Sequence, residues 1–272
     1  MERIKEAVEQ ARRERNSPAA EQSSPLKEPA AANGVEVAAV DIKYTQIPTV
    51  EVSPAVREKN RLVAAIPGHP LLDSFRMLRT RVLQEMKSNN WNTLAVISPT
   101  MGAGKTLTAI NLAIAIGRDL SHTALVVDAD LRRPTVSSYF DYTPEYGIND
   151  FILNDTPLNK IFFHPDVDRL IVLPGREPMS GSAEVLSSPK FQSLFKDLRT
   201  RYSDRIIVVD SAPVLEVDDV LALIPNLDCM LIVVESGVTT PEDLSRTMEL
   251  LQDIPVLGTV LNKVDKKFTV KD

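Results

Sequence analysis

Six short runs of apolar residues, most of them β-branched, recur between residues 94 and 261 of this 272-residue chain. They lie at residues 94–97, 124–127, 170–173, 206–209, 230–234 and 256–261. Runs of this length without polar alternation are typical of strands that are buried on both faces. Helical patterns accompany them near residues 70–87, 105–118, 183–201, 217–224 and 241–252. The alternation predicts an α/β fold with a mostly parallel sheet and flanking helices.

Charge and apolar composition narrow the class of protein. The chain holds 37 acidic and 31 basic residues, a net charge of −6, which disfavours broad binding to nucleic acid or to an anionic membrane surface. No apolar stretch approaches the roughly 18 residues that span a bilayer, and the charged first residues lack the apolar core of a secretion signal. The one cysteine, Cys229, lies in an apolar run and is expected to be a buried hydrophobe. We therefore expect a cytoplasmic protein without a disulfide framework and without a nucleic-acid partner.

The first 55 residues differ in character from the rest. Residues 1–16 predict a short charged helix with a thin apolar stripe, either frayed in solvent or docked on a partner. Residues 17–40 alternate proline with alanine, serine and charged residues, a composition typical of a flexible linker. Residues 41–53 are expected to be an extended arm that lies on the core or on a neighbour. We therefore divide the chain into an N-terminal region, 1–55, and a compact domain, 56–272.

A glycine-rich loop follows the first apolar run and leads into a helix. Its end reads Gly-x-Gly-Lys-Thr at residues 102–106, which is the end of a Walker A motif, and the first glycine of the longer pattern falls on Ser98 or Pro99. Such glycines let backbone amides converge on phosphate oxygens, while Lys105 reaches the β- and γ-phosphates and Thr106 offers a hydroxyl to Mg²⁺. The expected nucleotide-binding residues of the loop are Met101, Gly102, Ala103, Gly104, Lys105, Thr106 and Leu107.

Carboxylates follow two further apolar runs. Asp210 closes the run 206–209 in the manner of a Walker B aspartate, and Asp128 closes the run 124–127, two residues before Asp130. Because ligands of open α/β sheets collect at the carboxyl ends of strands, we expect Lys105, Asp128, Asp130 and Asp210 to form a catalytic cluster. Thr106, Asp128 and Asp210 are the expected metal ligands. The plainer interpretation, that Asp128 caps a turn and that Arg132 and Arg133 form a solvated turn, stays open.

Three motifs in order carry a resemblance to a known family. The segments Thr100–Thr106, Val126–Pro134 and Ile207–Pro213 resemble the phosphate loop, the Walker A-prime motif and the Walker B motif of the bacterial tyrosine kinases, over about residues 60–265. Relatives accompany capsule and exopolysaccharide synthesis. The resemblance implies a P-loop NTPase fold of the SIMIBI-like class, ATP and Mg²⁺ as cofactors, and protein-tyrosine (auto)kinase activity. It also implies that Arg132 helps to bind the nucleotide and that the Asn262 amide meets the adenine.

The same resemblance implies roles and partners. Asp128 would orient or deprotonate an attacking tyrosine hydroxyl or a water, and Asp130 would support it or the metal. Relatives form rings of subunits through Glu-x2-Arg-x2-Arg, which matches Asp73, Arg76 and Arg79 here, the shorter aspartate weakening ring closure. A membrane chain-length or co-polymerase protein of polysaccharide export is the implied partner. It would recruit the chain to the inner face of the membrane.

One departure keeps alternatives open. Relatives usually end in a tyrosine-rich tail, whereas residues 266–272 hold no tyrosine. The five tyrosines are Tyr44, Tyr139, Tyr142, Tyr146 and Tyr202, and the middle three are expected to pack or to line a surface turn. One alternative is an ATPase switch, or a nucleotide-binding regulatory subunit of a co-polymerase, without tyrosine kinase activity. The other, a partitioning or septum-positioning ATPase, is disfavoured because Thr100 stands where those proteins carry a second lysine.

Overall fold

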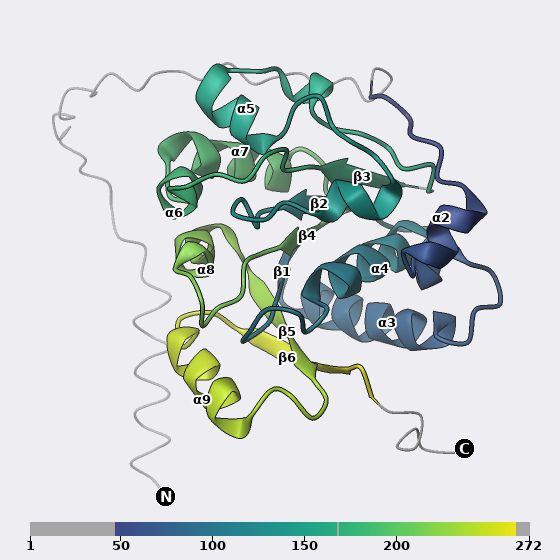
Figure 1. Cartoon of the computed structure of the whole chain (residues 1–272), viewed down its shortest axis with the longest axis vertical. Helices are drawn as coiled ribbons and strands as arrows, with labels where there is room; N and C mark the ends of the chain where they lie inside the picture. The colour runs from purple at the N-terminus through teal and green to yellow at the C-terminus, as the bar shows by residue number, and fades with distance from the viewer. Residues whose placement is uncertain (1–46, 168, 265–272) are drawn as a thin grey trace, which may run out of the picture. The chain divides into compact units, whose positions relative to one another are not determined.

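All six apolar runs are strands of one parallel sheet. The computed structural model describes residues 47–167 and 169–264. The strands are Thr93–Ile97 (β1), Thr123–Asp128 (β2), Leu170–Leu173 (β3), Arg205–Asp210 (β4), Cys229–Glu235 (β5) and Val256–Asn262 (β6). They lie in the order β3-β2-β4-β1-β5-β6, and every neighbouring pair is parallel (Figure 1). The predicted α/β fold is confirmed. Strand β1, which leads into the glycine-rich loop, therefore lies inside the sheet.

Helices cover both faces of this sheet. They are Pro54–Lys59 (α2), Leu72–Ser88 (α3), Lys105–Gly117 (α4), Ile148–Asn154 (α5), Ser182–Leu186 (α6), Pro189–Thr200 (α7), Asp219–Leu223 (α8) and Pro241–Leu250 (α9). Short 3-10 turns occupy Val63–Ala65 (η2), Val136–Phe140 (η3), Leu158–Lys160 (η4) and Ile224–Asn226 (η5). Buried residues of α3 and α4 share one core cluster, and those of α6, α7 and α8 share the other. The sheet is thus a middle layer.

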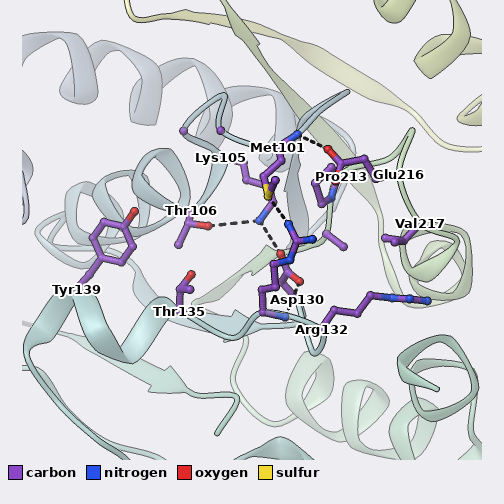
Figure 2. Close-up of a pocket in the computed structure, with 14 residues that line it drawn as sticks. Met101, Lys105, Thr106, Asp130, Arg132, Thr135, Tyr139, Pro213, Glu216 and Val217 are labelled. Atoms are coloured by element: carbon purple, nitrogen blue, oxygen red, sulfur yellow. Dashed lines mark hydrogen bonds and ion pairs between the residues drawn. The ribbon is translucent and has the colours of Figure 1, made fainter. Parts of the chain in front are cut away.

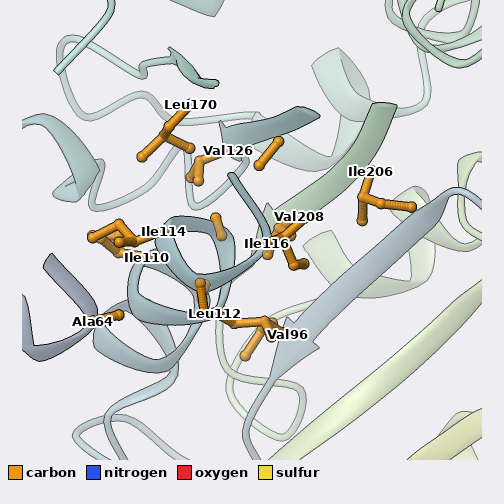
Figure 3. Packing of buried hydrophobic residues seen from close by; sticks show 14 of the residues in the cluster. Ala64, Val96, Ile110, Leu112, Ile114, Ile116, Val126, Leu170, Ile206 and Val208 are labelled. Atoms are coloured by element: carbon orange, nitrogen blue, oxygen red, sulfur yellow. The ribbon is translucent and has the colours of Figure 1, made fainter. Parts of the chain in front are cut away.

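Alternate residues of the central strands point into the two cores. Val96 and Val208 face the α4 side, where Ile110 and Ile114 are fully buried (Figure 3). Their neighbours along the strands, such as Val209, belong to the cluster on the other face. Each side chain buried in this way stabilises the fold by roughly 1.5–3 kcal/mol. Burial on both faces explains why these runs are apolar throughout.

Two sequence-based expectations differ from the structure. The helix expected over residues 183–201 is two helices, α6 and α7. Pro189 begins the second because it lacks an N–H, and the Ser188 hydroxyl caps it by accepting from the Phe191 N–H at 3.2 Å. Strand β6 is partly exposed along its length rather than buried on both faces, and it lies at one edge of the sheet. Leu261 is 58% exposed there. The strand at the other edge, β3, is better buried, and Phe163 pairs with its Val172.

The described part of the predicted arm lies on the core. The Val50 N–H donates to the His164 carbonyl at 2.7 Å, and Val52 is buried. The predicted helix 1–16 and linker 17–40 lie outside the described residues, and the domain boundary at residue 55 stays a prediction. Within the described ranges, no helix is long and apolar enough to cross a membrane. Cys229 is buried as expected, and burial raises the pKa of its thiol to about 12.

Asn111 ties the segment before α3 to helix α4. Its side chain is fully buried, its oxygen accepts the Ala64 N–H at 2.9 Å, and its amide donates to the Arg61 carbonyl at 3.0 Å. A second bond from the same amide reaches the Leu107 carbonyl at 3.0 Å, in the first turn of α4. One side chain therefore satisfies backbone groups on two segments that are far apart in sequence.

We predict that Asn111→Ala destabilises the domain. The change leaves the Ala64 N–H and the Arg61 carbonyl without these partners in a buried position, which costs about 1–3 kcal/mol for each group left unsatisfied. The free energy of unfolding, measured by urea denaturation, should fall by about 2–4 kcal/mol. The exposed Gln84→Ala on α3 is the matched control, and equal stability of the two variants would contradict the prediction.

Candidate nucleotide-binding site

The loop between β1 and α4 depends on two glycines with positive φ. Gly102 and Gly104 have φ values of +85° and +92°, which residues with a side chain rarely adopt. A Cβ on Gly104 would also lie 2.2 Å from the Asn262 side-chain nitrogen. That amide donates to the Ala103 carbonyl at 2.8 Å. The residue expected to meet adenine therefore lies directly against the loop, at the end of β6.

Lys105, at the start of α4, lies between two carboxylates. Its Nζ is 3.1 Å from Asp130 Oδ2 (Figure 2). The same Nζ is 3.4 Å from Asp210 Oδ1. Thr106 Oγ1 donates to Asp210 Oδ2 at 2.7 Å. Burial lowers the pKa of Lys105, but attraction to Asp210 and Asp130 outweighs it, so the pKa is raised overall. The lysine is therefore positively charged at neutral pH.

Asp128 is buried directly beside Asp210. The two residues are paired in register on the neighbouring strands β2 and β4, and both are 0% exposed. Asp128 Oδ2 accepts the Val136 N–H at 3.0 Å, while Oδ1 has no hydrogen-bond partner among the described residues. Burial and the negative charge of Asp210 raise the pKa of Asp128 well above its ordinary value. Burial raises the pKa of Asp210 as well, against the opposing effect of Lys105.

A cavity of about 260 Å³ opens beside the phosphate loop. Its lining includes residues of the loop, of the segment after β2 and of the segment after β4: Met101, Gly102, Gly104, Lys105, Thr106, Asp130, Arg132, Arg133, Thr135, Tyr139, Ala212, Pro213, Glu216 and Val217. Tyr139 and Glu216 lie at opposite sides of it (Figure 2). The structure thus brings Lys105, Thr106 and Asp130 into one hollow.

Several residues of this cavity have no counterpart in the sequence-based site, among them Glu216 and Tyr139. Glu216 Oε1 accepts the Met101 N–H at 2.7 Å, so one backbone amide of the phosphate loop is hydrogen-bonded to a carboxylate. The segment after β4 brings it there, because the Val214 N–H donates to the Ser98 carbonyl at 2.9 Å. Tyr139 is half-buried and packs on the core as expected for its cluster, yet it also lines the cavity. The only sequence signal for either was proximity to a strand's carboxyl end.

The two adjacent arginines after β2, Arg132 and Arg133, contact different groups. Arg132 Nε donates to Asp219 Oδ1 at 3.0 Å, and its terminal nitrogen lies 3.3 Å from Asp218 Oδ1. Asp219 is fully buried at the start of α8. Arg133 instead contacts the Met101 sulfur with its guanidinium. Arg132 therefore lines the cavity but is already engaged by two carboxylates.

The residues expected at a subunit interface lie on α3 and do not line this cavity. Arg76 forms an exposed ion pair with Asp73 at 3.0 Å. Arg79 turns toward α4 and donates to the Ala115 carbonyl at 3.4 Å. Their role between subunits stays a prediction.

The side chains fit a magnesium–nucleotide complex better than a metal held by protein alone. Within residues 47–167 and 169–264, no three acidic, histidine or cysteine side chains converge closely enough to hold a metal ion. Thr106 and Asp210 are hydrogen-bonded to each other at the end of the loop. Mg²⁺ commonly takes one or two protein ligands and completes its shell with waters and phosphate oxygens. Thr106 and Asp210 could hold it in this way, and the predicted role of Asp128, which lies beside Asp210, as a third ligand stays a prediction.

The comparison with protein families settles the family. The profile of the CobQ/CobB/MinD/ParA nucleotide binding domain matches residues 94–271, well over half of the chain. The chain belongs to this family. The predicted P-loop NTPase fold is therefore confirmed, and the description of the family supports nucleotide binding.

Individual relatives of this CobQ/CobB/MinD/ParA domain are named as tyrosine kinases. The chain is 28% identical over 207 residues to the putative tyrosine-protein kinase EpsB of Ralstonia nicotianae, covering 75% of this chain and 27% of EpsB. It is 25% identical over 200 residues to the putative tyrosine-protein kinase CapB of Staphylococcus aureus, covering 73% of this chain and 86% of CapB. The chain thus spans about a quarter of the length of EpsB and most of CapB. The resemblance to bacterial tyrosine kinases is confirmed.

A solved structure shares the fold. The kinase domain of the Escherichia coli tyrosine kinase ETK matches with a TM-score of 0.71 at 24% identity, covering 83% of this chain and 92% of that domain.

The pKa of Asp128 leads to a pH-dependent stability. The pKa of Asp128 is higher in the folded chain than in the unfolded chain. Between these two pKa values the folded chain binds more protons than the unfolded chain. The free energy of unfolding therefore falls as pH rises through the raised pKa. Asp128→Asn removes the ionisation. Without nucleotide or metal, we expect this variant to be more stable than wild type at pH 8, and the difference to shrink toward pH 4. Urea unfolding across that range tests it, with exposed Asp141→Asn as control; a pH-independent difference would contradict it.

The charge on Glu216 should oppose an anionic ligand. Glu216→Gln keeps an oxygen that accepts the Met101 N–H but removes the negative charge from the cavity. We expect nucleotide to bind about two- to fivefold more tightly, because the substitution removes one solvent-screened repulsion between the carboxylate and the phosphates. Calorimetric titration with Mg-ADP measures this, with Glu85→Gln on α3 as control. Weaker binding by Glu216→Gln would show that the carboxylate assists the site.

Proposed function

We propose that this chain is a magnesium- and ATP-dependent protein-tyrosine kinase that regulates bacterial exopolysaccharide or capsule synthesis and export. The observation that carries the proposal is the set of charged side chains at the carboxyl ends of β1, β2 and β4. Lys105 and Thr106 on α4 lie in contact with Asp210, and Asp128 is buried against Asp210 in the sheet. The kinase names of EpsB and CapB support tyrosine as the acceptor.

Each residue takes a role that follows from its position. Lys105 and the loop amides would neutralise the phosphate charge, and Thr106 and Asp210 would hold Mg²⁺, which would stabilise the charge on the phosphates. The bound nucleotide supplies the phosphoryl group for transfer. Asp128, with its raised pKa, orients the tyrosine hydroxyl and accepts its proton. Asp130 holds the Lys105 ammonium in place.

The partners follow from the same resemblance. We infer that a membrane chain-length or co-polymerase protein of polysaccharide export recruits the chain to the inner, cytoplasmic face of the membrane. We also infer that copies of the chain assemble as a homo-oligomer, with a ring as the expected form, through Asp73, Arg76 and Arg79. The exposure of the Asp73–Arg76 pair on α3 supports that interface.

Lys105→Met should abolish ATP turnover. The substitution removes the charge that faces the phosphates, and losses of this kind cost several kcal/mol of transition-state stabilisation. The measurement is release of phosphate and formation of phosphotyrosine after incubation with Mg-ATP, with and without a cytosolic segment of the membrane partner. Exposed Lys196→Met is the matched control. Circular dichroism must show that Lys105→Met is folded, and a folded variant that is fully active would refute the site.

The same assay separates the kinase from the alternatives. Phosphotyrosine that depends on Lys105 supports the kinase, and mass mapping of peptides then locates the acceptor. Phosphate release without phosphotyrosine supports an ATPase switch. ATP binding with neither product supports a regulatory subunit.

A further inference from the structure

The three cations that line the nucleotide cavity are not equally available. Lys105 is paired with Asp130 and Asp210, and Arg132 is paired with Asp218 and Asp219. The Arg133 side chain has no carboxylate partner among residues 47–167 and 169–264, and its guanidinium contacts Met101 of the phosphate loop. It is the cation in this hollow whose charge is not already balanced.

The backbone of Arg133 is fixed by the same carboxylate that holds Lys105. The Arg133 N–H donates to the Asp130 carbonyl at 3.0 Å and lies 3.1 Å from Asp130 Oδ1. The other oxygen, Oδ2, lies 3.1 Å from Lys105 Nζ. Asp130 therefore sets the position of Arg133 relative to the lysine of the loop. This turn directs Arg133 to the loop, whereas Arg132 is directed to α8.

The sheet order indicates which part of a nucleotide Arg133 meets. Strands β2 and β6 lie on opposite sides of β1, so Arg133 and Asn262 approach the phosphate loop from opposite sides. The resemblance implies that the base lies on the Asn262 side, and on that expectation the terminal phosphate lies on the Arg133 side. Arg133 contacts Met101. Of the residues that line the cavity, Met101 is the one nearest the start of the loop, at the end opposite to Leu107 on α4. The loop itself carries one lysine, Lys105, since threonine occupies position 100, where partitioning and septum-positioning ATPases carry a second lysine.

We propose that Arg133, rather than Arg132, recognises the terminal phosphate of a bound nucleoside triphosphate and so distinguishes triphosphate from diphosphate. The proposal rests on the proposed nucleotide site. A guanidinium forms two parallel hydrogen bonds to phosphate oxygens, which an ammonium does not. Arg132 has a different role, holding the segment after β2 to the buried Asp219 at the start of α8.

The experiment compares two ligands on matched variants. Calorimetry with Mg²⁺ measures Kd for ADP and for a non-hydrolysable ATP analogue on wild type, Arg133→Gln, Arg133→Lys, Arg132→Gln and the exposed α3 control Arg81→Gln. We expect Arg133→Gln to weaken the triphosphate at least about tenfold and ADP less than about twofold, with partial recovery in Arg133→Lys. Arg132→Gln should lower the melting temperature and affect both ligands alike. Arg81→Gln should match wild type.

Three results would overturn the inference. One is equal weakening of both ligands, or of neither, by a folded Arg133→Gln. Another is selective loss of the triphosphate in Arg132→Gln. A third is a wild-type protein that binds neither ligand, which overturns the proposed function as well. If wild type binds both ligands and Arg133→Gln binds them equally well, only the inference about Arg133 is overturned. The experiment therefore distinguishes failure of this inference from failure of the proposed function.

Discussion

The contact of the Lys105 ammonium with Asp130 and Asp210 is the interaction on which the rest of the site depends. It joins the start of α4 to the ends of β2 and β4, and each of the three residues is at most 9% exposed. A buried charge is tolerated only when it is paired, and removal of one partner leaves the other charges uncompensated. The negative charge is in excess here, since Asp128 lies beside Asp210 as well. Burial lowers the pKa of Lys105, but attraction to Asp210 and Asp130 raises it overall. Burial is the main cause of the raised pKa values of Asp128 and Asp210, and neighbouring negative charge adds to it.

Around this contact, a few hydrogen bonds connect the segments that follow β1, β2 and β4. Asp130 connects the lysine to the backbone of Arg133, Arg132 connects the same segment to α8, and Glu216 connects the segment after β4 to Met101. Each bond lies at the carboxyl ends of parallel strands, where ligands of open α/β sheets bind. The apolar strands β1, β2 and β4 hold these segments in register.

The sheet and the charged cluster could be predicted from sequence because their signals are local. Strand runs such as 206–209 are continuous, and the phosphate loop reads directly as Gly-x-Gly-Lys-Thr. Glu216 and Arg133 could not be assigned, because their roles depend on which segments meet after folding, and two adjacent arginines look alike in sequence. The break of the helix at Pro189 was readable from proline chemistry but was missed because the apolar period continues through it. The exposure of β6 is not visible in the sequence, since an apolar run reveals neither the place of its strand in the sheet nor what covers it.

The position of Asn262 has a thermodynamic consequence. Its amide fixes the Ala103 carbonyl, so the curvature of the phosphate loop depends in part on β6, which lies at the edge and is only partly covered. Local opening of a protein begins where few apolar contacts protect the backbone, and its free energy is lower at an edge than in the sheet centre. The loop therefore has two supports of unequal strength, the buried strand β1 behind it and the more easily opened β6 beside it. Amide hydrogen exchange along β6 should accordingly report how firmly the loop is ordered.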